Sequence, residues 1–123
     1  MNNFKYIFLW LTVALYACTS SKKMSYVFPE AMSESVKKEY LRQCEKGYVL
    51  YNINCAKCHT VKNKIPDFTP AQIYGYEMRL SNKQHEAQLT TETITTEELG
   101  YILSFLSYKK KSGLEFKGTH PDN

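Results

Sequence analysis

The stretch CEKGYVLYNINCAKCH (residues 44–59) combines two patterns that decide the fold. Its first part continues an apolar stripe that runs through residues 33–56 at intervals of three and four residues, as in an amphipathic helix. Its last five residues place the thiols of Cys55 and Cys58 and the imidazole of His59 next to one another. The sequence therefore predicts a long helix that ends in a group of chemically versatile side chains.

Two further helices are predicted, over residues 69–80 and 95–111. Each opens with a capping box, in which a Thr and a Gln or Glu three residues later bond the free backbone amides. These capping pairs are Thr69 with Gln72 and Thr95 with Glu98. No repeat and no convincing strand pattern is present, so the predicted fold class is all-α, with about three helices.

The group at Cys55, Cys58 and His59 could hold a metal ion, form a redox disulfide or anchor a haem. A dithiol redox site usually follows a strand in a βαβ pattern, which this chain lacks. A zinc site needs more ligands, and the remaining histidines, His85 and His120, are single and 35 residues apart. C-x-x-C-H is a signature of c-type haem attachment, because two thiols so spaced can reach both vinyl groups on one porphyrin edge. The haem interpretation is favoured.

With these residues the chain resembles a small monohaem cytochrome c of the class I type. In that family a Gly eight residues before the first Cys, and an aromatic residue four before it, lie where the last helix crosses the first. Gly47 and Tyr51 stand at those two positions. Apolar and aromatic residues of the last helix that match the family pattern are Ile102, Phe105 and Leu106.

The resemblance implies a cytochrome c-like domain over residues 33–112 that encloses one covalent haem c. It implies that Cys55 and Cys58 form the thioethers and that His59 is an axial iron ligand. The function implied is electron transfer between redox partner proteins, a donor and an acceptor, with no enzymatic reaction. The alternative is a haem-binding subunit or ligand sensor with an open distal site, associated with a larger oxidoreductase.

The second iron ligand is less clearly marked. The family usually places a Met on a loop about ten residues before the last helix, but His85 occupies that position here, ten residues before Thr95. Met78 lies 17 residues before Thr95, inside the predicted second helix, where a Met is commonly a core residue. We expect His85 as the ligand, with Met78 as the alternative and an open site as the third possibility.

The chain begins like an exported protein. Residues 6–17 form an apolar run behind Lys5, which is the layout of a secretory signal and is shorter than the ~20 residues that cross a bilayer. The run ends in LYAC, which resembles the lipobox of bacterial lipoproteins, with Cys18 as the lipidated residue. The sequence predicts a signal peptide (1–17) and a lipid anchor in a bacterial membrane, with the domain in the periplasm or at the cell surface.

The remaining segments carry less information. Residues 18–32 are polar and broken by Pro29, which predicts a flexible tether, and residues 113–123 are expected to form a C-terminal tail. The formal net charge of +4 is mild, and without a recognisable binding module we expect no nucleic-acid partner. The fourth cysteine, Cys44, shares the apolar stripe and is expected to be a small buried residue.

Overall fold

The structure is a computed structural model that describes residues 23–90 and 93–117, without the side chain of Met78. The predicted signal peptide (residues 1–17), the predicted lipidation site Cys18 and His120 lie outside the described residues. The described part is all-α, as predicted, and its elements besides helices are isolated β-bridges. Its helices are α2 (Glu34–Asn54), α3 (Ala56–His59), α4 (Pro70–Tyr74), α5 (Tyr76–Leu80), α6 (Lys83–Glu86) and α7 (Thr96–Tyr108). None of these described helices has the length and apolarity needed to cross a membrane.

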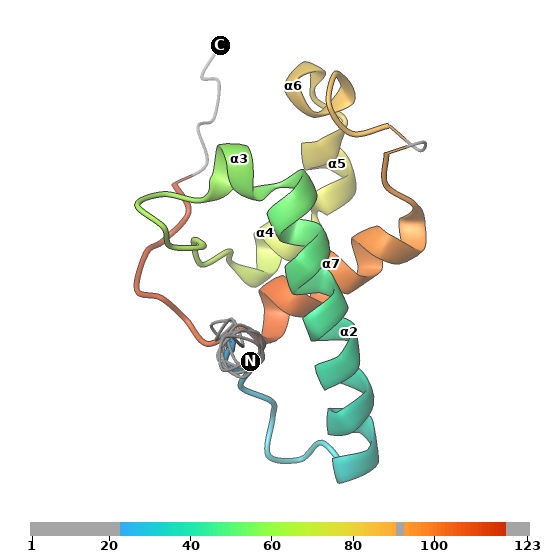
Figure 1. Ribbon diagram of the computed structural model, residues 1–123, viewed down its shortest axis with the longest axis vertical. Coiled ribbons are helices and arrows are strands. Elements are labelled where there is room, and N and C mark those ends of the chain that lie inside the picture. The colour runs from blue at the N-terminus through green and yellow to red at the C-terminus, as the bar shows by residue number, and fades with distance from the viewer. Residues whose placement is uncertain (1–22, 91–92, 118–123) are drawn as a thin grey trace, which may run out of the picture.

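The two long helices, α2 and α7, cross each other and form the frame of the domain (Figure 1). They meet at Gly47, which is buried. A Cβ atom at this position would lie 1.9 Å from the carbonyl oxygen of Tyr101 and 2.8 Å from the Cβ of Phe105. Since a Gly inside a helix costs about 1 kcal/mol relative to Ala, this close approach explains why a Gly is present. The crossing expected from the sequence is confirmed.

The core lies beside this crossing. Tyr51, Ile102 and Phe105 are 1%, 2% and 0% exposed, and the rings of Tyr51 and Phe105 are 5.6 Å apart between centroids. Cys44 lies on the same side of α2, fully buried, with its thiol 3.4 Å from the carbonyl oxygen of Ser104. Burial, and then the charge of Glu45, raise the pKa of Cys44 to about 12. Cys44 is therefore the small buried residue that the sequence predicts.

The segment between the long helices differs from the single helix predicted over residues 69–80. The chain breaks at Gly75, whose backbone angles (φ −89°, ψ 23°) leave the helical range, and α4 and α5 are each one short turn. A Gly weakens a helix at that point. A further short helix, α6, occupies the stretch expected to be a polar loop. Both predicted capping boxes, at Thr69 and at Thr95, are confirmed.

The described part of the segment before α2, residues 23–33, is packed, unlike the flexible tether that the sequence predicts over residues 18–32. The amide of Val27 donates to the carbonyl of Tyr108 (2.8 Å), and Lys110 donates to the carbonyl of Ser25 (2.8 Å). The ring of Tyr26 meets that of Phe105 edge-on, with 6.4 Å between centroids. The aromatic side chains within this polar stretch supply the apolar contacts that hold it against the end of α7.

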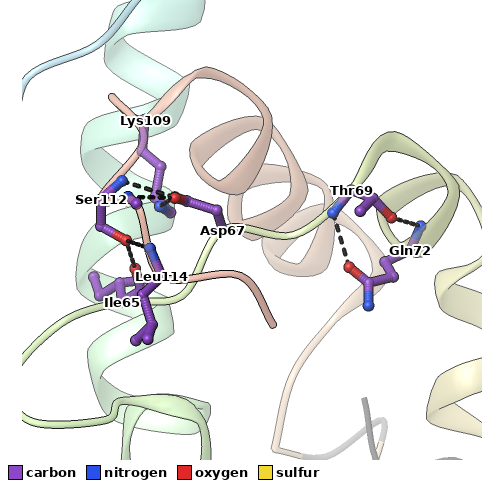
Figure 2. A network of polar contacts seen from close by, with 8 residues as sticks. Ile65, Asp67, Thr69, Gln72, Lys109, Ser112 and Leu114 are labelled. Atoms are coloured by element: carbon purple, nitrogen blue, oxygen red, sulfur yellow. Dashed lines mark hydrogen bonds and ion pairs between the residues drawn. The ribbon is translucent and has the colours of Figure 1, made fainter. Parts of the chain in front are cut away.

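The segment after α7 is packed as well, although residues 113–123 are predicted to be a tail. Within its described part, the amide of Asp67 donates to the carbonyl of Leu114 (2.7 Å), and Phe116 donates back to the carbonyl of Asp67 (3.1 Å). The carboxylate of Asp67 pairs with Lys109, which is only 5% exposed, and accepts from the amide of Ser112 (Figure 2). The packed unit therefore extends beyond residues 33–112 at both ends.

Candidate functional site

The three motif residues lie on a single turn at the end of α2. The amide of Cys55 donates to the carbonyl of Tyr51 (2.8 Å) and ends α2. The carbonyl of Cys55 then accepts from the amides of Cys58 (3.2 Å) and His59 (3.0 Å), which closes the turn of α3. Cys55 is half-buried and Cys58 is exposed, and both are free thiols. The turn thus holds two thiols and one imidazole close together on a backbone fixed by α2.

The Cys55 thiol lacks the lowered pKa that is usual for the reactive thiol of a dithiol redox site. Burial, and then the neighbouring Cys58, raise the pKa of Cys55 to about 11. A redox-active C-x-x-C needs a thiolate and usually has a lowered thiol pKa. Within residues 23–90 and 93–117, no three His, Cys, Asp or Glu side chains are grouped to hold a metal ion. In this part of the chain the motif and His85 therefore do not supply the full set of protein ligands that a structural zinc ion needs.

His85 lies on the short helix α6, which is distant from the motif in the sequence but next to it in space. Asn82 caps this helix, since its side chain accepts from the amides of Gln84 and His85 (3.0 Å each). Figure 1 shows α6 at the same end of the molecule as α3. The fold therefore brings together two histidines that are 26 residues apart in the chain.

The imidazoles of His59 and His85 face each other. Their Nε2 atoms are 3.5 Å apart, while the ring centroids are 5.8 Å apart and the ring planes differ by 10°. The two distances together require that both Nε2 atoms lie close to the line between the ring centres. The rings therefore meet edge to edge, with one nitrogen pointing at the other, and do not stack face to face.

The hydrogen bonding of His85 determines which of its nitrogens carries the proton. Nδ1 lies 3.0 Å from the carbonyl oxygen of Arg79. Because a carbonyl only accepts, Nδ1 is the donor, and the Nε2 of the neutral ring has its lone pair free. Metal-bound histidines are oriented in the same way, by a hydrogen bond from the nitrogen that does not bind the metal.

His59 lies in a largely aromatic setting. Its ring is 6.0 Å from that of Phe68 and 5.3 Å from that of Phe116, between centroids, and these two phenyl rings stack on each other at 4.7 Å. Burial, and then the neighbouring His85, lower the pKa of His59. The imidazole is therefore kept neutral near pH 7, as a metal-binding histidine must be.

Two buried hydroxyl groups, those of Tyr51 and Thr60, lie close to each other at the two ends of the motif turn. Within the described part of the chain, neither the hydroxyl of Tyr51 nor that of Thr60 makes a hydrogen bond of normal geometry. Burial raises the pKa of Tyr51 to about 12, against a small opposing effect from the Thr60 hydroxyl. The two groups are thus close enough to influence each other without being properly paired.

The opposed histidines fit two ligands on opposite sides of one metal atom. Two metal–imidazole bonds of about 2 Å each, in line, separate the nitrogens by about 4 Å, which is close to the 3.5 Å between the two Nε2 atoms. The free thiols of Cys55 and Cys58 sit on the turn that carries one of these ligands. Both observations are compatible with a haem held by this motif.

Several residues of the site are missed by the sequence prediction. Phe116 belongs to the segment expected to be a tail, and nothing in the sequence marks it as a neighbour of His59. Asn82, which holds His85, carries a weak signal, because an Asn followed by polar helix-forming residues is a typical helix start. The alternative ligand Met78 lies in α5, and its side chain is outside the described residues.

The comparisons with known proteins do not assign the chain to a family. No protein-family model matches the chain, and neither does any curated protein or solved structure.

Proposed function

We propose that this protein is a membrane-tethered monohaem c-type cytochrome that transfers single electrons outside the cytoplasm. The observation that carries the proposal is the opposition of the His59 and His85 Nε2 atoms at 3.5 Å, directly beside a C-x-x-C-H turn with two free thiols. A second support is the α2–α7 crossing at Gly47, the arrangement that the resemblance to a small cytochrome c implies.

In this proposal Cys55 and Cys58 would form the two thioethers of the haem, and His59 and His85 would be its iron ligands. The bound haem supplies the one-electron redox chemistry. The chain holds two imidazoles in line, through the Nδ1–H of His85 on one side and the aromatic contacts of His59 on the other. A site filled by two protein nitrogens has no coordination position for a substrate, which is why electron transfer is the function proposed.

The location follows from the N-terminal sequence. Cys18 would carry the lipid after removal of residues 1–17, so the domain would work at a bacterial membrane, in the periplasm or at the cell surface. Its partners would be an electron donor and an electron acceptor of protein nature.

The first experiment tests for haem. The chain is produced in a bacterium with a c-type cytochrome maturation system, purified, denatured and stained for covalent haem, and its reduced spectrum is recorded in alkaline pyridine. We expect one haem per chain with two thioether bonds, and loss of the covalent haem in the Cys55→Ala, Cys58→Ala double variant. The Cys44→Ala variant is the matched control and retains the haem. A wild-type chain without covalent haem would overturn the proposal.

The second experiment identifies the distal ligand by comparing His85→Ala with Met78→Ala. We expect the ferric spectrum of a six-coordinate bis-imidazole haem in the wild type, its loss in the first variant and its retention in the second. A wild-type spectrum of histidine and methionine ligation that Met78→Ala alone abolishes would make Met78 the ligand. Carbon monoxide binding to the reduced wild type at the rate of a five-coordinate haem would instead favour a ligand sensor or an oxidoreductase subunit with an open site.

A further inference from the structure

We propose that Asn82 is the positioning residue that aims the Nε2 of His85 at the iron. This inference rests on the proposed function, in which His85 is the distal ligand. Asn82 itself is not a proposed iron ligand. The oxygen of its side-chain amide holds the backbone of His85, and the nitrogen holds the carbonyl group to which the His85 ring is bonded.

The contacts of Asn82 form a clamp around His85. The side-chain oxygen of Asn82 accepts a hydrogen bond from the backbone amide of His85 at 3.0 Å, which fixes the position of the His85 backbone. The side-chain nitrogen of Asn82 donates to the carbonyl oxygen of Arg79 at 2.9 Å. That same carbonyl accepts from Nδ1 of His85 at 3.0 Å. One amide group therefore holds the backbone of His85 and also the carbonyl that holds its ring.

This clamp matters because α6 has little stability of its own. A helix of four residues, Lys83–Glu86, is far shorter than the 12 to 15 residues or so that an isolated helix needs in water. All four of these residues are at least partly exposed, so burial contributes little to fixing them. The position of His85 must therefore come mainly from local hydrogen bonds, and Asn82 makes three of them.

The clamp has two consequences for the iron site. It keeps the proton on Nδ1, so that Nε2 presents a lone pair, and it keeps the His85 plane within 10° of the His59 plane. A loosened clamp would let the ring rotate and the ligand leave the iron more often. Both effects can be measured on the haem protein without any electron-transfer partner.

The test compares Asn82→Ala, Asn82→Ser and Thr95→Ala in the full haem-loaded chain. Asn82→Ala removes both sides of the clamp, while Asn82→Ser keeps a capping oxygen for the His85 amide and loses the bond to Arg79. Thr95→Ala is the matched control, because it removes an equivalent side-chain cap from a different helix, α7, which carries no proposed iron ligand. Two quantities are measured: the rate at which carbon monoxide displaces the distal ligand of the reduced haem, and the g-anisotropy of the ferric haem.

We expect Asn82→Ala to raise the carbon monoxide rate roughly twofold to thirtyfold, the range that loss of an N-cap corresponds to. Asn82→Ser should give a smaller increase, and Thr95→Ala none, although it lowers the thermal stability. The ferric electron paramagnetic resonance of the wild type should be rhombic, as near-parallel imidazoles give, and should broaden or shift in both Asn82 variants, which lose the bond to Arg79, but not in Thr95→Ala. If Asn82→Ala does not retain haem, the comparison of the other two variants is used. A higher carbon monoxide rate in Asn82→Ser than in Thr95→Ala supports the positioning role, and equal rates contradict it.

The possible failures are distinct. A wild type that is bis-imidazole, with both Asn82 variants indistinguishable from Thr95→Ala, would overturn the positioning role and leave the proposed function intact. A wild type whose spectrum is unchanged by His85→Ala would overturn the distal ligand and the positioning role together.

Discussion

The crossing of α2 and α7 and the segment that carries His85 are built by different means. At the crossing, helices of 21 and 13 residues approach so closely that a single added carbon has no room, and the core residues Tyr51 and Phe105 beside it are buried. The His85 segment consists of helices of four or five residues whose side chains are largely exposed. Steric exclusion and burial specify the first region, and capping hydrogen bonds specify the second.

This difference separates the tasks of the two regions. The crossing fixes the direction of α2 and therefore the place of the C-x-x-C-H turn at its end. The capped segment only has to bring one nitrogen opposite another. A change at the crossing is therefore expected to affect the stability of the whole domain, whereas a change in the capped segment affects mainly the alignment of the site. Three substitutions test this contrast.

The largest effect is expected from Gly47→Ala. The new Cβ would lie 1.9 Å from the carbonyl oxygen of Tyr101, and a backbone atom cannot move aside as a flexible side chain can. The helices would have to separate, which opens the core around Phe105. We expect a loss of more than about 4 kcal/mol in the free energy of unfolding, measured by chemical denaturation of the haem-loaded protein.

Gly100→Ala is the matched control, because Gly100 also lies inside a long helix, α7, but a Cβ added there would meet no atom of a neighbouring segment within 4 Å. Here only the helix propensity changes, so the free energy of unfolding should increase by about 0.5–1 kcal/mol. Equal effects at the two glycines would contradict the close crossing of α2 and α7.

An intermediate effect is expected from Asp67→Asn, which acts where the two regions join. Asp67 follows the motif turn and pairs with the buried Lys109 just after α7. Burial alone would raise the pKa of Asp67, but the bonds from Lys109 and from the amides of Ser112 and Gly113 outweigh it and lower the pKa below its ordinary 3.8. Replacement leaves Lys109 buried without its counter-ion, which should cost about 3 kcal/mol.

The effect of Asp67→Asn should depend on pH in a defined direction. Since the pKa of Asp67 is lower in the folded state, the carboxylate stabilises the fold above the ordinary pKa of 3.8, and this contribution is lost as the pH falls through the lower, folded value. The difference between wild type and variant should therefore be full at pH 6 and shrink in acid. Glu39→Gln, in an exposed ion pair with Arg42, is the control and should change nothing measurable.

The periodicity of the sequence predicts the buried face of α2 much better than the capped segment, for a physical reason, whereas the crossing itself is implied by the resemblance to a small cytochrome c. Burial leaves a periodic pattern, so the stripe through Cys44, Gly47 and Tyr51 indicates both the helix and its buried face. Packing between distant segments leaves no such pattern, which is why Phe116 and the buried Lys109 are not found. Short helices held by caps are predicted only in part. The capping box at Thr69 is recognised from the sequence, whereas the break at Gly75 and the cap at Asn82 are not.

The smallest effect is expected from Tyr51→Phe, which removes the hydroxyl group of the side chain and keeps its buried ring. The ring of Tyr51 belongs to the crossing, in contact with Phe105, while its hydroxyl reaches toward Thr60 after the motif turn and makes no hydrogen bond of normal geometry. Loss of a buried, unpaired hydroxyl with the ring kept should change the free energy of unfolding by less than about 1 kcal/mol, or raise it slightly. Tyr51→Leu, which removes the ring, is the comparison and should cost clearly more. A loss of several kcal/mol in Tyr51→Phe would mean that the hydroxyl, and not the ring alone, ties the crossing to the turn that carries His59.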